Sequence, residues 1–362
     1  MTVSAVAPGA PGLAARPQAQ RRRLMFAAAL GVALLAMIAA AAVIGAAGIP
    51  LERLPAAFGL IPGDASLVAR DRLILWSIRL PRIAAALIVG ALLATSGAMM
   101  QGLFRNPLAD PGLLGVSGGA AFAAALAIVI GDRLLPAASF PLPLALPLAA
   151  FIGALATTAI LYRFATREGH TSIAVLLLAG LAIGALTSAA IGFLVYTADD
   201  RQLRDITFWM LGSLAGATWF KVLALAPFLA LVAAASQVIA RGLDLFVLGE
   251  AEAFHSGVAV EHMKRLGIVL VAAAAGAAVS VSGIVGFVGI IVPHLLRLVI
   301  GPGHRWLLPC SALLGAALLL GADTISRAIV APAELPIGIL TALIGAPFFL
   351  VLLVRQRGQL GP

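Results

Sequence analysis

Few residues of this 362-residue chain carry side chains that could do chemistry. The chain contains one cysteine, five histidines, 15 carboxylates and only two lysines, Lys221 and Lys264. Neither lysine follows the Gly-x4-Gly pattern of a phosphate-binding loop, so the chain lacks this device for binding ATP. Cys310 stands alone, which excludes an intrachain disulfide and a cysteine metal cluster. The residues therefore indicate neither this kind of ATP site nor a cysteine metal cluster.

One carboxylate, Asp323, lies clearly inside a long apolar run, where an acidic group could couple transport to protons or sodium. It stands four residues before Arg327, which is the spacing of an ion pair within one helix. We favour the ion pair. An ion-coupled secondary transporter remains the alternative function.

Four arginines, Arg70, Arg72, Arg79 and Arg82, precede the second apolar run, on the side predicted below to face outward. Positive charge is uncommon on that side of a membrane protein. The arginines either reach the lipid headgroups or expose guanidinium groups that bind the carboxylates of an acidic partner. We favour the acidic partner.

The elements that must position these residues are apolar. Hydrophobic residues make up 62% of the chain and charged residues 11%, and the mean hydropathy is +1.09. This composition predicts an all-α polytopic membrane protein. The net charge of +9 comes mostly from arginines scattered between apolar runs, which indicates membrane orientation and no nucleic-acid partner.

Ten membrane spans are predicted. The longest apolar run is interrupted by Gly283, Gly286 and Gly289, and it exceeds the length of one span, so we expect two short helices there. The predicted runs lie near 24–48, 83–104, 113–131, 142–164, 173–196, 219–240, 266–300, 306–329 and 336–354.

Orientation follows from the arginines near both ends of the chain, which place both termini in the cytoplasm. Two cytoplasmic termini require an even number of spans, and ten satisfies this. We predict a disordered cytoplasmic tail over 1–20 and a single transmembrane domain over 21–362.

The pattern Gly-Ala-x4-Ser-Gly-x9-Pro occurs twice, in the second and in the seventh predicted span. A displacement of five spans inverts the topology, so we expect two inverted five-helix repeats, the architecture of transporters with alternating access. Chance recurrence among 38 glycines is the alternative. The repeats cover about 21–200 and 219–357, and the two copies run from Gly90 to Pro107 and from Gly276 to Pro293.

Several longer motifs resemble one family. They are Ile78-Arg79-Leu80-Pro81-Arg82, the stretch from Ser96 to Gln101, the stretch from Asn106 to Gly115, Leu176 to Gly180, Gly286 to Gly289 with Val292-Pro293-His294, and Glu334 to Gly338. From about residue 70 onward the chain resembles the FecCD-type permease subunits of type II ABC importers for iron-siderophore complexes, haem and vitamin B12.

The resemblance implies partners, a location and a cargo. Permeases of this family work as ten-helix homodimers in the bacterial inner membrane, with two ATP-binding cassette subunits inside and a substrate-binding protein outside. The chain itself would be a transport subunit and not an enzyme, with no metal site and no permanently bound cofactor. ATP would bind to the partner subunit, and haem or a ferric chelate would be transported as cargo. Overall likeness, especially over 196–219, favours haem, followed by ferric siderophores and vitamin B12.

The inner loop over about 241–265 is the expected docking site of the ATPase subunit. Its short amphipathic stretch offers Leu245, Leu248 and Phe254 as anchors, although a solvated loop would have a similar composition. The resemblance implies that Leu248-Gly249-Glu250 opens the coupling helices. The predicted coupling residues are Leu245, Leu248, Gly249, Glu250, Glu252 and Phe254.

The resemblance also implies docking and gating residues. Arginines that match Arg79, Arg82 and Arg327 receive glutamates of the binding protein, and Asn106, Leu108, Thr171 and Ser172 match the cytoplasmic gate. For Asn106 with Pro107, good turn formation is an equally weighted alternative.

Overall fold

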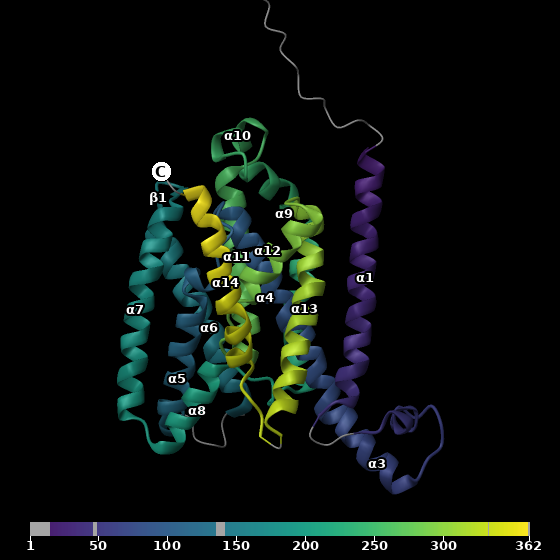
Figure 1. Ribbon diagram of the computed structural model, residues 1–362. Helices are drawn as coiled ribbons and strands as arrows, with labels where there is room; N and C mark the ends of the chain where they lie inside the picture. The colour runs from purple at the N-terminus through teal and green to yellow at the C-terminus, as the bar shows by residue number, and fades with distance from the viewer. Residues whose placement is uncertain (1–14, 46–48, 135–141, 332, 361–362) are drawn as a thin grey trace, which may run out of the picture.

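The computed structural model describes residues 15–45, 49–134, 142–331 and 333–360 of the protein. Ten apolar helices run along one bundle (Figure 1). Seven of them are long and apolar enough to cross a membrane, and three are shorter, so the predicted all-α polytopic fold is confirmed and ten spans are consistent with it. The ten helices are α1 (Ala15–Val43), α4 (Leu80–Leu103), α5 (Val116–Leu134), α6 (Leu142–Ala165), α7 (Ile173–Thr197), α9 (Trp219–Phe246), α11 (Val260–Ser282), α12 (Val288–Ile300), α13 (His304–Ile329) and α14 (Ile337–Leu360).

Helix α4, which carries the first copy of the repeated pattern, is the centre of the bundle. It packs against α13, α11, α9 and α12, and nearly all of its residues are buried. Small residues permit this packing. A side chain at Gly90 would collide with the backbone of Gly315, and one at Gly97 with the backbone of Gly289.

The two copies of the pattern lie on helices that run in opposite directions. The last residue of α4, Leu103, contacts Gly267 near the start of α11. Helix α11 ends at Ser282, Gly283 adopts a positive φ of 68°, and α12 begins at Val288. The predicted break is therefore confirmed, but only α12, with 13 residues, is short, because α11 with 23 residues is long enough for a full span. The opposite directions of α4 and α11 agree with inverted repeats.

Several boundaries differ from the sequence predictions. Helix α1 begins at Ala15, so part of the predicted disordered tail is helical; residues 1–14 of that tail lie outside the described residues. The helix ends at Val43, five residues before the predicted end. The second span is preceded by α3 (Ala65–Leu73) and the π-helical segment Ile74–Arg79, which continue directly into α4.

Two short elements were not expected. A two-stranded antiparallel hairpin, β1 (Thr166–Arg167) and β2 (His170–Thr171), joins α6 to α7. Helix α8 (Asp200–Leu211) lies between the two repeats and begins with a capping box, in which Asp199 and Gln202 satisfy each other's backbone amides.

The bundle has two distinct ends (Figure 1). The short helix α10 (Glu250–His255) and the hairpin lie at one end, where α1 begins and α14 ends. Helices α3 and α8 lie at the opposite end. The candidate functional residues divide between these two ends.

Candidate functional site

Helix α10 projects from the end of the bundle between α9 and α11 (Figure 1). The chain enters it through Gly249, whose φ of 128° is unfavourable for other residues. Leu248 and Phe254 are exposed side chains on this projection, Glu252 is also exposed, and Leu245 is half-buried. An exposed apolar projection of this kind is suited to insertion into a cleft of another protein.

Two side-chain contacts hold the base of this projection. Asp244, near the end of α9, accepts hydrogen bonds from the amide and from Nδ1 of His304, at 2.8 and 2.7 Å. Glu250, the first residue of α10, accepts a hydrogen bond from Lys264 of α11 at 2.7 Å. The predicted coupling residues are thus anchored to α11 and α13 as well as to α9.

The predicted gate residues lie at the α10 end, one pair in the turn after α4 and the other where β2 meets α7. The Asn106 side chain accepts a hydrogen bond from the Leu108 amide at 2.9 Å, which stabilises its own turn. Thr171 is buried at the end of the hairpin, and Ser172 caps α7 by accepting from the Val175 amide at 3.3 Å. No hydrogen bond joins the two pairs within the described residues, so their gating role stays a prediction.

The turn after α4 continues to Asp110, whose carboxylate accepts a hydrogen bond from the Gly112 amide at 2.8 Å. Burial raises the pKa of the Asp110 carboxyl, and this hydrogen bond opposes the effect. Asp110 therefore caps the 3-10 helix Pro111–Leu114, which follows the turn that carries Asn106 and Leu108.

The predicted docking arginines lie at the opposite end, and the expectation that they are exposed is wrong. Arg79, Arg82 and Arg327 are only 3%, 5% and 7% exposed. A guanidinium can be buried at low cost only when carboxylates or carbonyls satisfy it, and here this chain provides them. The docking role remains a prediction, because these contacts do not test it.

Asp323 of α13 is the centre of this cluster and is fully buried. It pairs with Arg82 of α4 at 2.9 Å and with Arg327, four residues along its own helix, at 3.1 Å. The predicted pair within one helix is therefore confirmed. Arg82 also binds Glu334 at 2.7 Å, and Arg79 donates to the carbonyl oxygens of Ala42 and Val43 at the end of α1.

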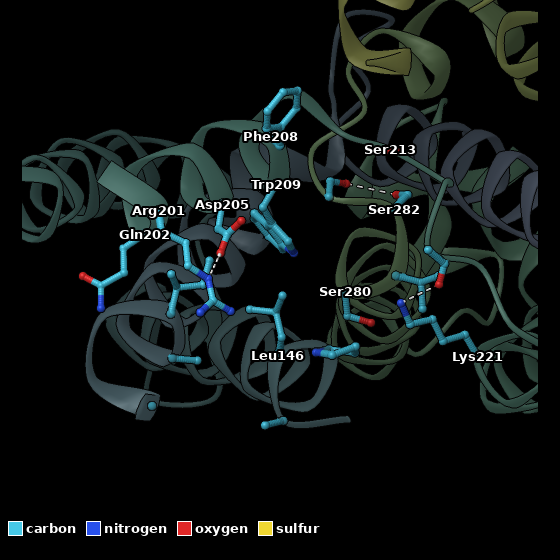
Figure 2. A pocket seen from close by; sticks show the side chains of 18 residues that line it. Leu146, Arg201, Gln202, Asp205, Phe208, Trp209, Ser213, Lys221, Ser280 and Ser282 are labelled. Atoms are coloured by element: carbon cyan, nitrogen blue, oxygen red, sulfur yellow. Dashed lines mark hydrogen bonds and ion pairs between the residues drawn. The ribbon is translucent and has the colours of Figure 1, made fainter. Parts of the chain in front are cut away.

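A pocket of about 400 Å³ opens between α5, α6, α8 and the end of α11 (Figure 2). Arg201, Asp205 and Trp209 of α8 face Ser280 across it, and Lys221 lies beyond Ser280. Arg201 and Asp205 form an ion pair at 3.9 Å, and Lys221 donates to the Gly216 carbonyl at 2.8 Å. The charged groups of the pocket are therefore already occupied by partners within the chain.

The sequence did not indicate the roles of two carboxylates, Glu334 and Glu261, and of one cation, Lys264, in these clusters. Glu334 and Arg82 are 252 residues apart, and no local pattern links them. Lys264 and Glu261 have the i, i+3 spacing of a helical pair, which was a usable signal.

The fold and these two ends define a multi-pass membrane transport subunit built from inverted repeats. The model of the FecCD transport family matches residues 30–355, and the chain belongs to this family. Its members are permease subunits of ABC importers for haem, vitamin B12 and chelate-type cargo.

Known relatives agree with this membership. The chain is 50% identical over 288 residues to the hemin transport system permease protein HmuU of Yersinia pestis, which covers 78% of this chain and 84% of that protein. It is 44% identical over 302 residues to the vitamin B12 import system permease protein BtuC of Klebsiella pneumoniae, covering 83% and 88%. Among solved structures, a metal-chelate type ABC transporter in an inward-facing conformation matches with a TM-score of 0.79 at 33% identity, covering 91% of this chain and 99% of that chain.

These findings confirm the resemblance seen in the sequence motifs. The relatives are transport permeases rather than enzymes, and in this family the ATPase is a separate subunit. The chain is accordingly a permease of the ABC importer class.

Proposed function

We propose that this chain is the transmembrane subunit of an ATP-driven importer that moves haem inward by alternating access, with ferric siderophores and vitamin B12 as the next candidate cargoes. The observation that carries this proposal is the 50% identity to a hemin permease. The inverted repeats around α4 and α11 support alternating access.

We place the α10 end in the cytoplasm of a bacterial cell, with both termini on the same side. Arginine-rich segments at this end support that orientation through the positive-inside rule. They include Arg21, Arg22, Arg23, Arg105, Arg163, Arg167, Arg241 and Arg265.

Two ATP-binding cassette subunits are the proposed partners at this end. The exposed side chains of Leu248 and Phe254 support docking of α10 in a cleft of the ATPase, and ATP binds there because this chain has no phosphate-binding loop. A second copy of the chain completes the proposed dimer, whose axis carries the cargo between the Asn106–Leu108 and Thr171–Ser172 turns.

A substrate-binding protein is the proposed partner at the opposite end. Arg70 and Arg72 are exposed there and can receive its carboxylates first. Arg82 is reached only when an incoming carboxylate replaces Glu334, which occupies it within this chain. We therefore expect Arg70→Glu with Arg72→Glu to weaken the complex in a salt-dependent way.

Reconstitution in proteoliposomes tests the proposal. The chain is combined with the ATPase and binding protein encoded beside it, and uptake of haem, a ferric siderophore and cobalamin is measured with and without ATP. ATP-dependent uptake of haem, and of haem in preference to the others, is expected. Uptake driven by an ion gradient without ATP would instead establish the secondary transporter. The occupation of Asp323 by two arginines argues against that alternative.

Two matched variants test the ATPase site. Leu248→Asp places a charge on the α10 projection, whereas Leu60→Asp makes the same change on an exposed leucine at the opposite end. Copurification of the ATPase subunit in detergent is expected to be lost with the first variant and kept with the second. Equal retention in both would move the docking site away from α10.

A further inference from the structure

The ammonium group of Lys264 is buried at the cytoplasmic end, with the residue only 4% exposed. Its three N–H donors have three acceptors. They are Glu250 Oε2 at 2.7 Å, Glu261 Oε1 at 3.1 Å and the Thr171 carbonyl at 3.0 Å. Such complete satisfaction makes Lys264 a junction between the elements that supply the acceptors rather than a surface charge.

The junction is closed by a second contact to the same peptide unit. The Thr171 amide donates to Glu261 Oε2 at 3.0 Å, so both backbone groups of Thr171 are held by α11 residues. The hydroxyls of Thr171 and Thr166 lie 3.0 Å apart across the hairpin. The hairpin is therefore bonded to α11 through the Thr171 backbone, and its two strands are joined through the threonine hydroxyls.

These contacts join three elements that are separate in the sequence. Glu250 is the first residue of α10, Lys264 and Glu261 belong to the first turns of α11, and Thr171 is followed by Ser172, which caps α7. A displacement of α10 therefore reaches the start of α7 through one side chain.

Helix α7 is suited to respond to such a displacement. Within this chain only Leu176, Ile191 and Leu194 of its 25 residues are buried, whereas α4 is buried along almost its whole length. Helix α7 packs along one side against α5 and α6, and its ends supply the remaining restraint. Its cytoplasmic end is the one fastened at Thr171.

We propose that Lys264 is a positioning residue that transmits movement of α10 to α7, with Glu250 as the input contact and the Thr171 peptide as the output contact. This inference rests on the proposed function, since it assigns the α10 movement to a bound ATPase. Lys264 itself contacts neither ATP nor cargo.

The test separates the junction from the proposed function by using two readouts. Lys264→Met removes the ammonium group and keeps the length of the side chain, and Lys264→Arg restores a cation. Arg265→Met is the matched control, because Arg265 is the exposed neighbour on the same helix. All chains are assembled with their ATPase and binding protein in proteoliposomes.

The first readout is the ratio of cargo taken up to ATP hydrolysed. Lys264→Met is expected to assemble and hydrolyse ATP while this ratio falls by about tenfold, Lys264→Arg to recover part of it, and Arg265→Met to keep the wild-type ratio. A wild-type ratio in Lys264→Met would overturn the inference while leaving the importer established.

The second readout is hydrogen exchange of the amides over 166–172, which needs no transport. Lys264→Met is expected to accelerate exchange at Thr171, because its amide loses the fixed position of Glu261. Unchanged exchange would show that the junction does not hold the hairpin. The wild-type chain could also show no ATP-dependent uptake while Lys264→Met still accelerates exchange. That result would overturn the proposed importer function and the transmission role of Lys264, but it would support the contact between Lys264 and the hairpin.

Discussion

Asp323, the carboxylate at the centre of the outer charged cluster, is closed to water, although Glu334 at the edge of that cluster is 40% exposed. In the cluster around Lys264 both carboxylates are partly exposed. Asp323 is fully buried between Arg82 and Arg327, which are themselves buried. Lys264 is also buried, but the side chains of its partners Glu250 and Glu261 are 37% and 31% exposed. The two clusters use the same chemistry in different surroundings.

This difference indicates which cluster can move during a transport cycle. Separating Asp323 from its arginines would leave charges in a low-dielectric interior, which costs several kcal/mol. Separating Lys264 from Glu250 allows the carboxylate to take up water at once. The outer cluster therefore fixes α4 to α13, and the inner cluster can move together with α10 because its carboxylates are partly hydrated.

The largest effect is expected from Asp323→Asn, which keeps the shape of the side chain but leaves the buried Arg327 guanidinium without its carboxylate and Arg82 with Glu334 alone. The free energy of unfolding should fall by about 3–5 kcal/mol. Reversible unfolding in mixed micelles, followed by tryptophan fluorescence, measures it. A loss below about 1 kcal/mol would mean that water reaches this cluster, and the contrast between the two ends would disappear.

Lys264→Met should have a smaller effect on stability, because both orphaned carboxylates can turn toward solvent. We expect the free energy of unfolding to fall by about 1–3 kcal/mol. The same unfolding assay applies, with Arg265→Met as the control that should change nothing measurable. A loss as large as that of Asp323→Asn would make the inner cluster a fixed structural element.

Glu334→Gln and Glu250→Gln form a matched pair, one at each end, with side chains 40% and 37% exposed. Each variant should lower the free energy of unfolding by about 0.5–1 kcal/mol, since solvent screens a partly exposed ion pair. Equal losses would show that the two clusters differ in the surroundings of their central residues, Asp323 and Lys264, and not in the strength of the ion pairs made by Glu334 and Glu250. Unequal losses measured in the same assay would locate the difference in the outer carboxylates instead.

The smallest effect is expected from Arg201→Ala, which removes the exposed i, i+4 pair with Asp205 on α8. Such a pair contributes about 0.3–0.5 kcal/mol. This variant supplies the baseline for a surface ion pair in the same protein. A loss above about 1 kcal/mol would indicate a structural role for the pocket in Figure 2.

Local features of the chain could be predicted from the sequence. The break between α11 and α12 follows from closely spaced glycines in a run too long for one span, and the Asp323–Arg327 pair follows from helical spacing. Helix α8 was missed although its capping residues Asp199 and Gln202 have the spacing of a capping box.

Long-range pairing could not be predicted in this way. Arg82 reads as exposed because its partners Asp323 and Glu334 are more than 200 residues away. For the same reason the sequence indicated neither the hairpin contact of Lys264 nor the fastening of Arg79 to the end of α1. The motifs indicated that some of these residues have a function, but only the fold showed which residues they contact.

The pairing of Arg82 with Asp323 also imposes an order on biosynthesis. The two residues are 241 positions apart, so α4 enters the membrane long before α13 exists. At about 5–20 residues per second the interval is on the order of 10–50 s. During that time the arginine has to remain hydrated or at the headgroup level. Asp323 of the late helix α13 thus neutralises the charge of Arg82 on the early helix α4. A nascent chain that stops ahead of α13 should be recognised by membrane quality-control proteases.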